Sequence, residues 1–157
     1  MKTIFGVLIL AIVSPALAGD KHWLEGITDE RYEITVYRSE FCGCCKGWIS
    51  HLQDHNFDVT DITVEDMNPI KQKYQVPANA ASCHTAEVNG VVIEGHVPAQ
   101  DIKRLLATEH DTHLLTVPAM PSGTPGMDMP GARKDAFDVL SVSREGETEV
   151  FNTHLEY

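Results

Sequence analysis

The chain has 157 residues, which is enough for one domain with a substantial core and too few for two ordinary domains. Hydrophobic residues make up 43% and charged residues 22%, a globular composition. The net charge of −11 argues against nucleic acid as a partner, because a phosphate backbone needs a basic surface.

The first 18 residues predict a secretory signal peptide. Lys2 supplies a positive charge, residues 4–13 are apolar, and residues 14–18 end with small residues at Ala16 and Ala18. The apolar run is too short to span a bilayer comfortably, and the alternative is a retained N-terminal anchor. We expect cleavage after Ala18, no stable membrane insertion afterwards, and a mature domain of residues 19–157 outside the cytoplasm, where thiols tend to oxidise.

The first half of the mature chain alternates predicted strands and helices. Residues 19–32 are polar and predict an exposed lead-in that includes His22 and Trp23. Alternation of β-branched and aromatic residues then predicts strands, and apolar positions at helical spacing predict helices. The expected elements are a strand at 33–37, a helix at 44–55, a strand at 57–64 and a helix at 66–74.

A hairpin and a third helix follow. Residues 85–88 and 91–94 flank Asn89-Gly90, a strong signal for a two-residue hairpin turn, and residues 98–106 predict a helix. This order predicts an α/β fold of the thioredoxin-like type, a mixed sheet flanked by helices, with its core at about 33–107. The extension at 108–157 should hold a loop rich in Met, Pro and Gly at 117–131 and a closing strand pair at 137–142 and 148–151.

Three of the four cysteines stand in Cys42-Gly43-Cys44-Cys45, between the first strand and the first helix. Cys42 and Cys45 form a Cys-x-x-Cys frame, and a helix N-terminus stabilises a thiolate. The frame therefore predicts redox chemistry. Two structural disulfides are an alternative, although a disulfide between the neighbours Cys44 and Cys45 would be strained.

The fourth cysteine, Cys83, lies in the loop that precedes the hairpin. In a thioredoxin-like chain this loop passes beside the Cys-x-x-Cys site, so we expect all four sulfurs to converge. Four thiolates are soft ligands that select Cu(I), Zn(II) or an iron–sulfur cluster. Adjacent cysteines reach one tetrahedral zinc ion poorly, whereas several Cu(I) ions can share bridging thiolates.

Methionine and histidine side chains provide further candidate ligands. The thioethers of Met120, Met127 and Met129 suit Cu(I), and the alternative is a flexible loop or core filling. His84 directly follows Cys83, and His96 stands just after the second strand of the hairpin. Both are candidate metal ligands or groups that support the ligands. Five other histidines are interpreted as surface residues: His51, His55, His110, His113 and His154.

Several segments together resemble the CopG family of periplasmic copper-resistance proteins. They are residues 34–37, 42–48, 81–86, 92–98 and 117–123, and the resemblance extends over about 33–151. It implies a thioredoxin-like fold and a copper–thiolate cluster held by Cys42, Cys44, Cys45 and Cys83. It also implies a role in copper tolerance beside exporters and oxidases, with a redox step.

These observations favour a periplasmic protein that holds several Cu(I) ions per chain in a polynuclear thiolate site. Its expected partners are copper ions and components of copper export or oxidation in the periplasm. The alternative is an enzyme, a thiol–disulfide oxidoreductase with Cys42 as the nucleophile and Cys45 as the resolving thiol. A secreted domain with two structural disulfides is the third hypothesis.

Overall fold

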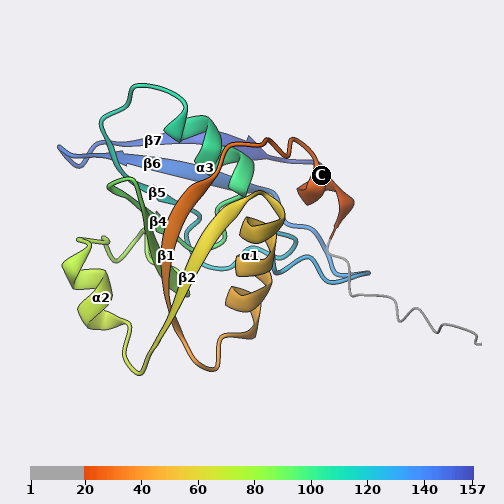
Figure 1. Cartoon of the computed structure of the whole chain (residues 1–157), viewed down its shortest axis with the longest axis horizontal. Helices are drawn as coiled ribbons and strands as arrows, with labels where there is room; N and C mark the ends of the chain where they lie inside the picture. The colour runs from red at the N-terminus through yellow and green to blue at the C-terminus, as the bar shows by residue number, and fades with distance from the viewer. Residues whose placement is uncertain (1–19) are drawn as a thin grey trace, which may run out of the picture.

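The computed structural model describes residues 20–157, in which seven strands form one mixed sheet that helices flank (Figure 1). The predicted signal peptide at residues 1–18 lies outside the described residues. Within residues 20–157, no helix has the length and apolar character needed to cross a bilayer.

The first four strands follow the predicted order along the chain, and the last two form the predicted hairpin. Strand β1 (Tyr32–Ser39) pairs in parallel with β2 (Phe57–Val64), and helix α1 (Gly43–Asp54) connects them. The short helix α2 (Asn68–Lys73) leads to the antiparallel hairpin of β3 (His84–Val88) and β4 (Val91–Glu94), with β3 against β1. Asn89 and Gly90 both adopt positive φ, 50° and 80°, as a tight hairpin turn requires.

The C-terminal residues continue the same sheet. Helix α3 (Ala99–Leu106) carries the chain from β4 to β5 (Thr112–Thr116), which lies parallel to β4. The predicted closing pair is present as β6 (Phe137–Ser143) and β7 (Thr148–His154), and the order across the sheet is β2-β1-β3-β4-β5-β6-β7. Strand β5 is missing from the sequence prediction because its residues are mostly buried and show no alternation.

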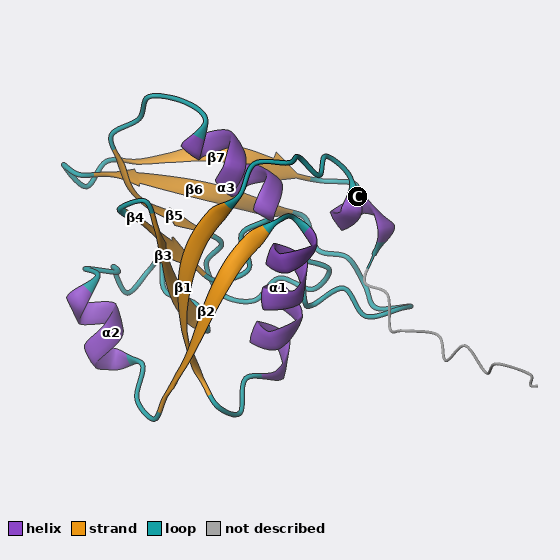
Figure 2. Cartoon of the chain, viewed as in Figure 1, coloured by secondary structure: helices purple, strands orange, loops and turns teal. Residues whose placement is uncertain are grey.

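The main core lies between one face of the sheet and helices α1 and α3. Trp48 and Leu52 of α1 and Ile102 of α3 are fully buried in it. A smaller cluster on the opposite face contains Val92 and Leu114 and is partly covered by residues that follow α2. Figure 2 shows α2 on the other side of β1 and β2 from α1.

The prediction of an exposed lead-in is wrong for Trp23. This residue lies in a short 3₁₀ turn, η1 (Lys21–Leu24), and its side chain is 2% exposed. The indole Nε1 donates to the carbonyl of Gly123 at 2.9 Å, and the ring packs beside Phe137 and Tyr157. The N-terminal segment therefore covers an end of the core where the C-terminal extension arrives.

The surface interpretation of His51 and His55 is also wrong. Both are buried because they lie on the side of α1 that faces Trp23 and the start of α3. The His51 Nε2 accepts a hydrogen bond from the Ala99 N–H at 2.9 Å, and the His55 ring bonds the Trp23 carbonyl at 2.6 Å.

The three remaining histidines differ in exposure. His110 is exposed, as predicted. His113 and His154 are half-buried, because the His113 ring bonds the Tyr74 carbonyl at 3.0 Å and the His154 ring contacts the Asp101 carboxylate at 2.8 Å.

Candidate metal centre

Three of the four sulfurs lie at the N-terminus of α1. Cys42 is the N-cap residue, and no side chain caps the free N–H groups of the first turn, so this end of the helix keeps its partial positive charge. Cys42 and Cys45 form a disulfide, with Cα atoms 5.4 Å apart. Cys44 is free, and its Sγ lies 3.5 Å from that of Cys42. Cys45 is buried, whereas Cys42 and Cys44 are half-buried.

The fourth sulfur approaches from the start of β3. The Sγ of Cys83 lies 3.6 Å from that of Cys45, and all four sulfurs lie within 4.8 Å of one another. The convergence expected from the loop position is therefore present. Cys83 is also a free thiol, so the structure does not contain the two disulfides of the third hypothesis.

Cys83 also contacts the two histidines that the sequence suggested as candidate ligands. Its Sγ lies 3.2 Å from Nδ1 of His84 and 3.1 Å from Nε2 of His96, and both rings are fully buried. The Pro125 carbonyl accepts a hydrogen bond from His96 Nδ1 at 2.7 Å, so Nε2 keeps the lone pair that faces the sulfur. Cys83, His84 and His96 thus make a second group of potential ligands that shares Cys83 with the first.

Burial controls the protonation of this second group. It lowers the pKa of His84 and of His96, so both imidazoles are neutral at neutral pH. Burial, followed by the nearby Cys44, raises the pKa of Cys83 to about 12. A cation that binds the Cys83 sulfur must therefore displace a proton.

The Pro- and Gly-rich loop reaches the site through its backbone at residues 125–126. Gly126 has a φ of +85°, and a Cβ added there would lie 2.5 Å from the Trp48 nitrogen and 2.7 Å from the Cys44 oxygen. Only glycine fits this close contact. Together with the bond from His96 to the Pro125 carbonyl, the contact seats the loop on the first turns of α1.

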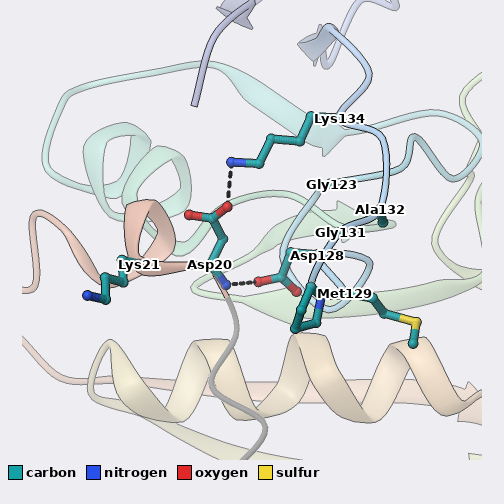
Figure 3. Close-up of a pocket in the computed structure, with 9 residues that line it drawn as sticks. Asp20, Lys21, Gly123, Asp128, Met129, Gly131, Ala132 and Lys134 are labelled. Carbon is teal, nitrogen blue, oxygen red and sulfur yellow. Dashed lines mark hydrogen bonds and ion pairs between the residues drawn. The ribbon is translucent and has the colours of Figure 1, made fainter.

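The three predicted methionines occupy different environments. Met127 is half-buried directly after the contact at Gly126, and Met120 is 52% exposed. Met129 is 73% exposed and lines a cavity of about 310 Å³ with Asp20, Asp128 and Lys134 (Figure 3). Within residues 20–157, neither cysteine nor histidine lines this cavity.

Sequence reasoning missed the role of Glu94, which ends β4. Its side chain is fully buried and accepts hydrogen bonds from the Ser82 N–H at 2.6 Å and the Thr85 hydroxyl at 2.7 Å. Lys71 of α2 forms an ion pair with it. Burial raises the pKa of Glu94, against the opposing effect of these partners. The sequence signal that could have identified this residue is a carboxylate directly after the apolar run 91–93.

The fold and the site define a class: a mixed α/β protein with a cysteine-rich candidate metal site at a helix N-terminus. The family described as "Protein of unknown function, DUF411" matches residues 80–127, a segment that holds Cys83, both histidines and two of the methionines. No curated protein matches the chain.

Two solved structures are similar over nearly their whole length. "Copper resistance protein copG- Form 1" is 43% identical, with a TM-score of 0.74, and the match covers 80% of this chain and 98% of that one. "Copper resistance protein copG- Form 2" is 42% identical, with a TM-score of 0.75 and coverage of 80% and 100%. The chain therefore belongs to the CopG family of copper resistance proteins.

Proposed function

We propose that this protein binds copper at the four-cysteine site and acts in copper resistance or homeostasis. The observation that carries the proposal is the convergence of four sulfurs within 4.8 Å of one another. Sulfur ligands are soft and favour Cu(I). The similar structures named as copper resistance proteins support the choice of copper over zinc.

The finer proposal is a polynuclear Cu(I) site with several ions per chain. The neighbours Cys44 and Cys45 are poorly placed to bind one tetrahedral ion together, and bridging thiolates remove this constraint. His84 and His96 contact the Cys83 sulfur and are proposed as additional ligands or supporting groups. Met127 and Met120 are proposed with them, whereas Met129 has less support because it lines the separate cavity.

The oxidation state of the cysteines sets the number of available thiolates. The Cys42–Cys45 disulfide leaves two free thiols, Cys44 and Cys83. Adding two electrons and two protons to the disulfide yields two more thiols, and all four can then bind as thiolates after losing their protons. Copper capacity should therefore follow the redox state of this one bond.

An anaerobic titration of the reduced mature protein with Cu(I) tests the proposal. We expect more than one copper ion per chain, and a lower capacity in a matched sample that keeps the Cys42–Cys45 disulfide. A stoichiometry of one or none in the reduced protein would contradict the polynuclear site. Counting free thiols in both samples verifies their redox states.

We also propose that the mature protein is periplasmic, begins after Ala18 and exchanges copper with export or oxidation components there. The predicted signal peptide supports this location. Mass spectrometry of the protein from a periplasmic fraction should show a chain that starts at residue 19. Recovery of the full-length chain from the membrane fraction would instead support the retained anchor.

A second candidate function, a thiol–disulfide oxidoreductase, is favoured by the Cys42–Cys45 disulfide. In the reduced protein, the half-buried Cys42 would attack a substrate disulfide as a thiolate and form a mixed disulfide. The buried Cys45 would then attack Cys42 Sγ, release the substrate as a dithiol and form the disulfide present in the structure.

Insulin reduction with and without copper separates the two functions. Activity in the metal-free protein that Cu(I) and Cys42→Ser each abolish would support the oxidoreductase. Absence of activity in the metal-free, reduced protein would leave copper binding as the function of the site.

A further inference from the structure

We propose that Glu94 is a positioning residue that fixes the segment carrying Cys83 and His84 for metal binding. The inference rests on the copper-binding function proposed above and deepens it. Glu94 is distant in sequence from the Cys-x-x-Cys frame, and it acts through the backbone and side chains on either side of Cys83.

The Glu94 carboxylate bridges the two ends of a four-residue segment. Its Oε1 accepts the N–H of Ser82 at 2.6 Å, and its Oε2 accepts the hydroxyl of Thr85 at 2.7 Å. Cys83 and His84 lie between these two contacts. The sheet strengthens the arrangement, because Glu94 is the register partner of Thr85 across the β3–β4 hairpin. One side chain therefore determines where both residues enter the site.

Two further contacts hold Glu94 in place, one to its carboxylate and one to its backbone. Lys71 of α2 pairs with Oε1 and also lies 3.3 Å from the Thr85 hydroxyl, so the negative charge has a cation beside it. The backbone carbonyl of Glu94 accepts the Val117 N–H at 3.1 Å, next to β5. A fully buried carboxylate needs such partners, and two of them, Ser82 and Thr85, are the ends of the segment that it orients.

Glu94→Gln tests the proposal because glutamine keeps the size of the side chain and removes its charge. Groups that orient metal ligands commonly change metal affinity by about 10- to 100-fold, so we expect Cu(I) affinity to fall at least about tenfold in competition with a chelator. Glu87→Gln is the matched control, since Glu87 lies on β3 and bonds the Gly90 N–H at the far end of the hairpin. We expect the control to stay within about twofold of the wild type.

A double-mutant cycle distinguishes positioning from general damage. If Glu94 acts through Cys83, Glu94→Gln should have little further effect on Cu(I) affinity in a Cys83→Ser background. An equal loss in both backgrounds would overturn the proposal, and so would an unchanged affinity in the single variant. Thr85→Val, which removes the hydroxyl that contacts Oε2 and Lys71 and leaves the Glu94 carboxylate in place, replaces Glu94→Gln if that variant does not fold.

A measurement without metal separates this inference from the copper-binding proposal. In a Cys44→Ser background with the Cys42–Cys45 disulfide intact, Cys83 is the one free thiol. Glu94→Gln should accelerate alkylation of Cys83 by roughly threefold or more, because the segment loosens and the thiol becomes more accessible. An unchanged rate would overturn the inference even if the wild type binds copper. Failure of the wild type to bind Cu(I) would refute the proposed function, and the alkylation rate would then decide the positioning role.

Discussion

The candidate site joins two arms with different surroundings. The helix arm consists of Cys42, Cys44 and Cys45 at the start of α1, where two of the three residues are half-buried and two share a disulfide. The strand arm consists of Cys83, His84 and His96 around β3 and β4, where both imidazoles are fully buried and the thiol has a raised pKa. Cys83 belongs to both groups of potential ligands.

This difference assigns different tasks to the two arms. The helix arm is the more exposed of the two and contains the disulfide, so we expect reductant and incoming copper to reach it first. The strand arm is held by Glu94 from one side and by the Pro125 carbonyl from the other. It should contribute fixed geometry and release a proton when a cation binds.

Substitution of Cys83, the residue that both arms share, should have the largest effect on copper affinity. Cys83→Ser removes a sulfur from both groups, whereas Cys44→Ser removes one from the helix arm alone. If four ligands share a binding free energy on the order of 10–16 kcal/mol, losing one costs about 3 kcal/mol or more, roughly 100-fold in affinity. Cu(I) competition assays should show a larger loss for Cys83→Ser. Equal losses would mean that the strand arm adds nothing beyond one sulfur.

The junction between the loop and the helix arm gives the next largest effect. Gly126→Ala places a Cβ 2.5 Å from the Trp48 nitrogen at a φ of +85°, so we expect a loss of roughly 2–3 kcal/mol of stability, measured by urea unfolding. Gly131→Ala is the matched control, because Gly131 has a φ of +78° and nothing within 4 Å of an added Cβ. Equal losses in the two variants would show that backbone strain, and not the close contact, explains the effect.

The helix arm was largely predictable from the sequence, because its chemistry is local. A Cys-x-x-Cys frame between a strand and a helix places three sulfurs at a helix N-terminus without knowledge of the rest of the chain. The position of Cys83 also followed, since the Asn89-Gly90 turn sets the register of the hairpin. The mixed sheet with its helices and closing strand pair was confirmed for the same reason, as each element has its own periodic pattern.

The parts that were missed depend on contacts between distant segments. Strand β5 is buried within the sheet and lacks alternation, so its pattern does not separate it from a loop. Trp23 stands among polar residues and His51 is itself polar, so neither was predicted to be buried. Their rings pack edge to face where the N-terminal turn covers α1. Glu94 is a charged residue whose buried carboxylate is stabilised by Ser82, Thr85 and Lys71, and all three lie outside its own strand.

Acid should destabilise the protein through its buried histidines, and His51 is the clearest case. Its ring packs beside Trp23 and His55, and burial lowers its pKa from 6.5 to about 3, with the charges of His55 and His96 adding to the shift. The unfolded chain binds a proton below pH 6.5 and the folded chain does not until about pH 3, so stability is complete above 6.5 and falls as the pH drops. At pH 5 this one group should cost about 2 kcal/mol.

Urea unfolding between pH 7 and pH 5 checks this expectation. His51→Gln should reduce the pH dependence by the share of this one ring, since glutamine can accept the Ala99 N–H without a titratable group, while the other buried imidazoles keep theirs. His110→Gln, at an exposed position, should leave the dependence unchanged. A wild-type stability that is constant across this range would show that these imidazoles are not held neutral by burial.

The smallest predicted effect concerns the two sulfurs of the disulfide. After reduction, Cys42 should be alkylated about tenfold faster than Cys45, because Cys42 is half-buried at the N-cap of α1 while Cys45 is buried. Time-resolved mass spectrometry of the labelled peptides from the Cys44→Ser variant compares the two sulfurs without interference from their neighbour. Preferential labelling of Cys45 would reverse the roles of nucleophile and resolving thiol. Equal rates would mean that Cys45 becomes as exposed as Cys42 once the bond is reduced. The difference in exposure between the two sulfurs would then depend on the disulfide itself.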